Sequence, residues 1–399
     1  MFKEKDILLT EARLKQKAKI NVANSNDLSS NNLNTLNIPK KKSAPKIAKS
    51  GKMPKFLNLI LVITTLIILF VALILIILKT IRITKSNINY KNLIPISFSL
   101  NDNYAYPLIV SLTSILYNSP PDTFFIFYLL LHPDLQETKI KKILGIKNKY
   151  QNCKFELIHM GNNYSTYPDN YNKSAAIYYK LELSNLIPDF DKIIYLDVDT
   201  IVHKDINEMY DIDMKKYYYI GFPAHNITNS QSNEKKNLIN TGVLLINLKE
   251  LRKVNGTKLL QDYYNVHNNQ KVDDEYLINS VFYDKISFLP FIYGIPDFGA
   301  GNELTKSPSH FCQEFQNQVN ISVSVLENAS KNRVITHNYY EDIKWWMKNY
   351  NNLTDFGKQW LFYASKSNVF DEICKNYNQF ESQCEKIKKK AFKFNLLLF

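Results

Sequence analysis

One short segment, residues 193–199, constrains the fold of this chain more than any other. It reads Ile-Ile-Tyr-Leu-Asp-Val-Asp, four apolar residues followed by two carboxylates one residue apart. A continuous apolar run with β-branched and aromatic members is typical of a strand buried on both faces. Because side chains at i and i+2 of an extended chain point the same way, we expect Asp197 and Asp199 to project together.

Paired carboxylates at the end of such a strand have two interpretations. The carboxyl ends of parallel strands are where open α/β sheets bind ligands. Two hard oxygen ligands there suit Mg²⁺ or Mn²⁺, which usually also coordinates a substrate phosphate. The alternative is that Asp197-Val198-Asp199 is a polar turn that closes the strand, since short acidic motifs are common. The rest of the chain has to discriminate between them.

Short apolar runs alternate with longer amphipathic segments from residue 93 onward. We expect strands at 93–100, 124–131, 154–159, 193–196 and 241–246. We expect helices at 104–117, 134–149, 174–186 and 274–282. This alternation predicts an α/β domain over residues 92–350, with a parallel sheet flanked by helices.

Two later segments are less regular. Residues 290–301 read as a loop or a strand edge, because Pro and Gly punctuate them. Residues 351–399 are expected to form a helical, basic extension. Its end, residues 386–399, alternates basic and apolar side chains, so it either touches a membrane or packs onto the domain.

An apolar run precedes the domain. Residues 56–78 are 23 positions without a charge, long enough as a helix to span a bilayer core of about 30 Å. A signal peptide fits poorly, because no small-residue cleavage site follows the run. Seven lysines flank its amino side and four basic residues its carboxyl side, which favours a cytosolic amino terminus. We therefore expect a single-pass type II protein of the Golgi or ER, with a stem at 79–91 and a lumenal domain.

The net charge of +13 belongs mostly to the tail before this run. Residues 1–55 hold 13 basic and 4 acidic residues, and the remaining chain holds 37 and 33. The Asn-, Ser- and Lys-rich tail reads as disordered. No dense basic stripe with interleaved aromatic residues occurs in the rest of the chain, so we expect no nucleic-acid partner.

Cysteines and glycosylation sequons agree with a lumenal domain. All four cysteines follow the apolar run, and in an oxidising lumen they allow two disulfides in any of three pairings. Seven Asn-x-Ser/Thr sequons also follow it, although an Asn-rich chain produces several by chance. They begin at Asn163, Asn172, Asn226, Asn255, Asn320, Asn328 and Asn352.

Further polar segments accompany the two aspartates. A strand-to-helix turn at 101–104 offers groups that can bind and stack a base, or that simply cap the helix. Three carboxylates at 273–275 open a helix, where they also interact favourably with its amino terminus. The other candidates are Lys180, the strand entry Asn240-Thr241-Gly242, and His337 followed by Lys344-Trp345-Trp346.

In this order, the segments closely resemble glycosyltransferase family 8, the retaining GT-A enzymes that use nucleotide sugars. The resemblance spans about residues 93–350, and its most specific pieces are YLDVD at 195–199 and NTGVLLINL at 240–248. It implies a GT-A fold, a UDP-sugar donor, and a Mn²⁺ (or Mg²⁺) ion held by Asp197, Asp199 and His337.

The same resemblance implies roles for the other residues. Contacts to the nucleotide would come from Asn101, Asn103 and Tyr104, with uracil stacked on the Tyr104 ring. Val198 would lie at the donor with its flanking aspartates, and Lys344 would contact the diphosphate. Around the donor sugar it places Lys180, Asn240, Asp274 and Glu275, and either of these two carboxylates could shield or trap an oxocarbenium-like centre.

Three positions depart from the family pattern. Lys180 stands where arginine is frequent, Glu275 where glutamine is usual, and the segment from His337 to Lys344 is one residue longer and lacks a glycine. The sequence thus predicts a UDP-sugar-dependent hexosyltransferase acting on a glycan or glycoprotein acceptor, which variable loops at 224–237 and 290–309 would bind. The alternative is a catalytically silent family member that binds UDP-sugar or serves as a scaffold.

Overall fold

The computed structural model divides into two units, residues 1–81 and 82–399. In the first unit it describes residues 56, 60 and 62–74, and 62–74 are helical with exposed apolar side chains. In the second it describes 90–167, 174–223, 238–267, 272–296, 322–338, 344, 355–377 and 380–396. Within these residues no helix has both the length and the apolarity for a membrane crossing. The expected span at 56–78 therefore stays a prediction, and the tail at 1–55 lies outside the described residues.

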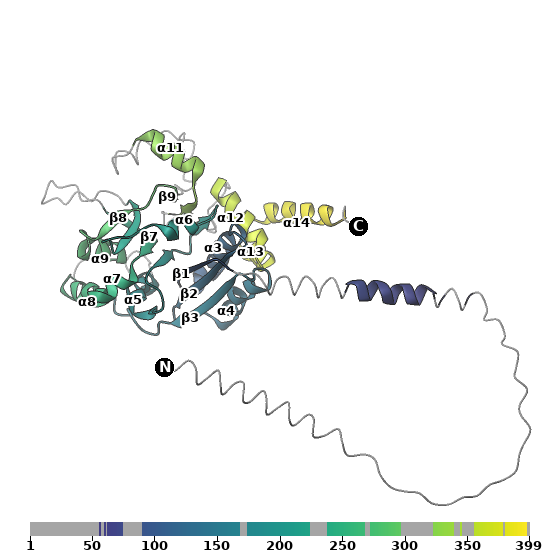
Figure 1. Cartoon of the computed structure of the whole chain (residues 1–399), viewed down its shortest axis with the longest axis horizontal. Coiled ribbons are helices and arrows are strands. Elements are labelled where there is room, and N and C mark those ends of the chain that lie inside the picture. Colours follow the sequence, from purple (N-terminus) through teal and green to yellow (C-terminus); the bar gives the residue numbers. More distant parts are fainter. Residues whose placement is uncertain are drawn as a thin grey trace, which may run out of the picture. The chain divides into compact units, whose positions relative to one another are not determined.

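A seven-stranded sheet in the order β3-β2-β1-β4-β7-β6-β8 forms the centre of the second unit (Figure 1). Its strands are β1 (Asn92–Leu100), β2 (Thr123–Leu131), β3 (Cys153–His159), β4 (Ile193–Leu196), β6 (Tyr219–Pro223), β7 (Ile239–Ile246) and β8 (Ile286–Phe288). The first four strands of that order are parallel, whereas β7 runs antiparallel to both β4 and β6. The expected mostly parallel α/β sheet is confirmed, and β7 is its antiparallel exception.

Helices cover both faces of this sheet, which is why its central strands are continuous apolar runs. Side chains alternate along β4: Ile194 and Leu196 join one core, while Ile193 and Tyr195 join the other. The first core includes residues of α3 (Ala105–Tyr117), α4 (Glu137–Leu144), α6 (Asn207–Asp211), α12 (Asp355–Lys366) and α13 (Phe370–Asn376). The second includes residues of η4 (Ala175–Glu182), α5 (Leu183–Leu186), α7 (Leu248–Lys253), α8 (Gly256–His267) and α9 (Asp274–Val281).

Two expected helices are interrupted. The segment expected at 134–149 begins only at Glu137 and changes after α4 into the short 3₁₀ helix η2 (Gly145–Asn148). The segment expected at 174–186 starts with the 3₁₀ helix η4, capped by the Ser174 side chain, before α5. Local propensity does not separate these helix types, so one continuous helix was the wrong expectation in both places.

The carboxyl-terminal extension shares the core of the domain. Trp360 on α12 is 1% exposed, and α12 packs against α3. A disulfide joins Cys374 on α13 to Cys384 on α14 (Glu381–Leu396), and Ile387 packs against the same core. Cys153 is a buried free thiol, whereas the fourth cysteine lies outside the described residues.

A second, three-stranded sheet lies in the order β5-β10-β9. It consists of β5 (Thr200–Val202), β9 (Tyr293–Pro296) and β10 (Ile335–His337), and α11 (Val323–Asn332) precedes β10. The segment expected as a loop or strand edge at 290–301 thus contains a strand, although 297–301 lie outside the described residues. Since β5 directly follows the two aspartates, this sheet brings β10 to them.

Candidate active site

Three segments distant in sequence converge where β4 ends. The Asp197 amide donates a hydrogen bond of 2.8 Å to the carbonyl of Gly242 on β7. On the other side, β10 pairs antiparallel with β5 so that His337 lies opposite Thr200. The Asn338 amide then donates to the Asp199 carbonyl at 3.0 Å. Backbone pairing therefore carries the imidazole to the two carboxylates.

Asp197, Asp199 and His337 form a group that can hold a metal ion. One ligand atom from each lies within 4.8 Å of the others. His337 Nε2 is 3.3 Å from Asp199 Oδ1 and 3.7 Å from Asp197 Oδ2. Asp199 and His337 are buried, whereas the Asp197 side chain is 35% exposed. The group is thus open to solvent on the side of Asp197.

Gly242 lets the His337 imidazole and Asp197 Oδ2 lie directly against the backbone of β7. A Cβ at this position would lie 2.1 Å from His337 Cε1 and 2.8 Å from Asp197 Oδ2, which no side chain tolerates. Two carboxylates and an imidazole grouped in this way fit Mn²⁺, and Mg²⁺ less well because of the nitrogen ligand.

Lys344 is buried against the same site. Its ammonium lies 2.6 Å from Asp199 Oδ2 and donates to the Asn338 carbonyl at 2.9 Å. Burial opposes ionisation of Asp199, but Lys344 and His337 outweigh it and hold the pKa of this carboxyl well below its usual value. Lys344 therefore stands beside the metal-ligating group, and its expected diphosphate contact remains a prediction.

Lys180 connects the metal-ligating group to the start of α9. Its ammonium is 2.7 Å from Asp274 Oδ2 and 3.6 Å from Asp197 Oδ1, and it donates to the Thr241 carbonyl at 3.0 Å. Burial disfavours this charge, yet the two aspartates raise the pKa of Lys180 well above its usual value. Thr241 also donates to Asp274 Oδ2 through its hydroxyl, at 2.7 Å.

The other carboxylates that open α9 have separate roles. Asp273 is the cap of the helix, because its side chain accepts from the Tyr276 amide at 2.8 Å. Glu275 instead accepts a hydrogen bond of 2.9 Å from Asn240 Nδ2. The capping interpretation therefore holds for Asp273, while Asp274 and Glu275 contact groups on other segments.

The turn after β1 lies at the same edge of the sheet, since β1 and β4 are parallel neighbours. Asn101 caps η1 (Asp102–Tyr104) by accepting from the Asn103 amide at 3.1 Å. The capping interpretation is thus correct for Asn101, and the expected nucleotide contacts of Asn101, Asn103 and Tyr104 remain predictions.

Sequence reasoning placed Gly242 and Tyr195 within its motifs but gave neither residue a role of its own. The Tyr195 hydroxyl donates to Asp197 Oδ1 at 2.9 Å. The available signal was that Tyr195 stands two residues before Asp197, because residues at this spacing share a face in an extended chain.

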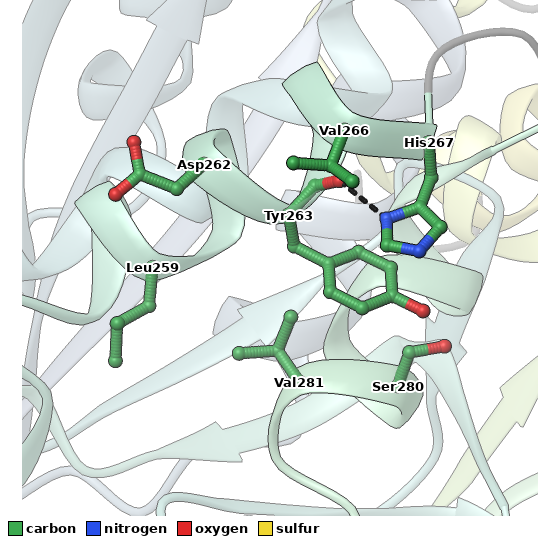
Figure 2. Close-up of a pocket in the computed structure, with 7 residues that line it drawn as sticks. All are labelled: Leu259, Asp262, Tyr263, Val266, His267, Ser280 and Val281. Atoms are coloured by element: carbon green, nitrogen blue, oxygen red, sulfur yellow. Dashed lines mark hydrogen bonds between the residues drawn. The ribbon is translucent and has the colours of Figure 1, made fainter.

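A cavity of about 420 Å³ lies between α8 and α9 (Figure 2). Its lining residues are Leu259, Asp262, Tyr263, Val266, His267, Ser280 and Val281. None of them is among the expected site residues, so the chemistry expected from the sequence lies elsewhere, at the strand ends.

The sheet and the strand-end carboxylates define an α/β protein with a GT-A-like fold. The sequence profile of glycosyl transferase family 8 matches residues 95–322, and the chain belongs to this family. The family expected from the motifs is therefore confirmed.

Relatives agree with this assignment. A Haemophilus influenzae protein that carries a glycosyltransferase assignment is 30% identical over 204 residues, which are 49% of this chain and 61% of that protein. The crystal structure of the galactosyltransferase LgtC with donor and acceptor sugar analogs superposes with a TM-score of 0.56 at 19% identity, covering 69% of this chain and 96% of LgtC. The bifunctional glycosyltransferase WbbM gives 0.57 at 17% identity, covering 72% of this chain and 52% of WbbM. At these identities the two structures support the fold alone.

Proposed function

We propose that this chain is a retaining glycosyltransferase that transfers a hexose from a UDP-sugar to a glycan or glycoprotein, assisted by Mn²⁺ or Mg²⁺. The observation that carries the proposal is the convergence of Asp197, Asp199 and His337 within a family 8 domain. The UDP-sugar donor and the hexose are the expectation from the family motifs, and the similarity to LgtC adds the fold alone.

The chemistry begins with departure of UDP. Cleavage of the bond between sugar and UDP leaves negative charge on the β-phosphate, which a divalent cation stabilises as a Lewis acid. Asp197, Asp199 and His337 would hold this ion. Lys344 keeps Asp199 ionised, and its positive charge would help to offset the negative charge that develops on the departing UDP.

The carboxylates of α9 would face the sugar. Asp274 is buried and bound by Lys180 and Thr241, so its carboxylate is poorly placed to attack the sugar as a nucleophile. Glu275 is less buried and is held by Asn240. We therefore assign to Glu275 the stabilisation or trapping of an oxocarbenium-like centre, and to Asp274 the positioning of Lys180.

The activity test measures UDP release from a panel of UDP-sugars with Mn²⁺ and a mixed glycan acceptor. The matched variant is Asp197→Asn, because it keeps the shape of the side chain and leaves the buried Asp199–Lys344 pair intact. Release from one donor, lost in the variant and on addition of a chelator, is the expected result. Metal-dependent UDP binding without release would instead favour a catalytically silent protein.

We also propose that the apolar residues 56–78 anchor the domain on the lumenal side of a Golgi or ER membrane. Three sequon asparagines lie within the described residues, Asn163, Asn255 and Asn328, and all three are exposed. In a lumenal domain they are available to the glycosylation machinery. We expect endoglycosidase treatment to increase the mobility of the protein in gel electrophoresis, and we expect Asn→Gln substitutions at these sequons to reduce that change. Protease digestion of the domain in sealed vesicles would refute this topology.

A further inference from the structure

The two oxygens of Asp197 face different partners. Oδ1 accepts the hydrogen bond of 2.9 Å from the Tyr195 hydroxyl and lies 3.6 Å from Lys180 Nζ. Oδ2 lies 3.7 Å from His337 Nε2. The carboxylate is thus oriented with one oxygen bound on the protein side and the other toward the remaining metal-ligating atoms.

Tyr195 has little freedom to move. It is 1% exposed, and its ring lies in the core on the face of β4 covered by η4 and α9. The Lys180 ammonium lies 4.4 Å from the ring centroid, within cation–π distance. Strand and core together therefore fix the point in space from which the hydroxyl donates.

Asp197 needs such a restraint more than Asp199 does. Its side chain is 35% exposed, whereas that of Asp199 is 10% exposed and is bound by Lys344. A partly exposed carboxylate without a hydrogen-bond donor can turn about its terminal torsion, which has a broad profile. A donor on one oxygen is what keeps the other directed at His337.

We infer that Tyr195 is a positioning residue of the metal site, whose hydroxyl holds Asp197 with Oδ2 toward His337 and so increases the affinity for a divalent cation. The inference rests on the proposed metal-dependent function. Removing a partner that orients a metal ligand typically costs about 10–100-fold in metal affinity.

The test is Tyr195→Phe, which keeps the ring and its contact with Lys180 and deletes only the donor. Mn²⁺ alone, without nucleotide, is titrated into the full-length chain and followed by calorimetry and by the electron paramagnetic resonance signal of free Mn²⁺. We expect binding weaker by about 10–100-fold. In turnover, the KM for Mn²⁺ rises while kcat at saturating Mn²⁺ stays near the wild-type value.

Tyr178→Phe is the matched control. Tyr178 is also 1% exposed, and its hydroxyl donates to the Val272 carbonyl at 2.8 Å, so its loss removes a buried hydroxyl without touching Asp197. This variant should bind Mn²⁺ like the wild type. Unfolding of each variant in chelator shows how much stability each hydroxyl contributes by itself.

The outcomes distinguish failure of the positioning role of Tyr195 from failure of the proposed metal-dependent function. If Tyr195→Phe binds Mn²⁺ as tightly as the wild type, the positioning role alone is overturned. The same holds if Tyr178→Phe loses as much Mn²⁺ affinity as Tyr195→Phe. Absence of Mn²⁺ binding by the wild type overturns the metal-dependent function and this inference with it.

Discussion

Replacing Asp199 with alanine should destabilise the domain as well as remove a metal ligand. The Asp199 carboxylate lies 2.6 Å from Lys344 Nζ, and the two side chains are only 10% and 7% exposed. Removing one partner of a buried pair costs about 3–5 kcal/mol, because the other charge stays buried without its counter-ion. Lys344 keeps a hydrogen bond to the Asn338 carbonyl, so we expect the lower end, about 3 kcal/mol.

Equilibrium urea unfolding in chelator at neutral pH measures this loss without any contribution from metal. The double variant Asp199→Ala/Lys344→Met removes both charges, so most of the lost stability should return while Mn²⁺ binding stays absent. Asp262→Ala is the control, because Asp262 pairs with Lys258 at the surface, where the side chains are 54% and 62% exposed. It should cost less than about 1 kcal/mol. The reasoning fails if Asp199→Ala costs no more than the control, or if the double variant loses the sum of both single losses.

Three further predictions concern the titration of His203, the missing side chain of Gly242 and the charge of Glu275. Burial, together with Arg333 and Lys204, lowers the pKa of His203 to about 3. The unfolded chain therefore binds this proton first as pH falls below about 6.5, and stability is lost between about 6.5 and 3 by at most ~1.4 kcal/mol per pH unit. As the pH is lowered, the urea concentration at the midpoint of unfolding should fall less steeply for His203→Gln than for the wild type. Equal dependence on pH in the two proteins would contradict this. Gly242→Ala should abolish Mn²⁺ binding in a calorimetric titration, because its Cβ would displace the His337 imidazole and Asp197 Oδ2; unchanged affinity would show that binding does not need these groups in their present positions. Glu275→Gln keeps an acceptor for Asn240, so its melting temperature should match the wild type, and a fall in kcat should reveal the carboxylate's role in transfer; unchanged kcat would remove that role.

The strand that ends in the two aspartates was predictable because its information is local. Four apolar residues between Lys192 and Asp197 define β4 at Ile193–Leu196, as the structure has it. The motifs of the family are likewise contiguous in sequence, so they indicated both the family and the fold. Helix types were less predictable, since 174–186 has a helical pattern that does not distinguish η4 from α5.

Contacts between distant segments required the tertiary structure. His337 reaches Asp199 only because β10 pairs with β5, and Lys180 meets Asp274 only because η4 and α9 pack on the same face of the sheet. Among the described cysteines, the pairing of Cys374 with Cys384 also could not be chosen from spacing.

The sequence by itself determined the apolar strands, the residue types of the site and the family, because periodicity and motif order are properties of neighbouring residues. Only the tertiary structure decided which of these residues share a site, with His337 beside Asp199 and Lys180 beside Asp274. Those relations depend on strand register and core packing across more than 100 residues of chain, and no local pattern encodes them.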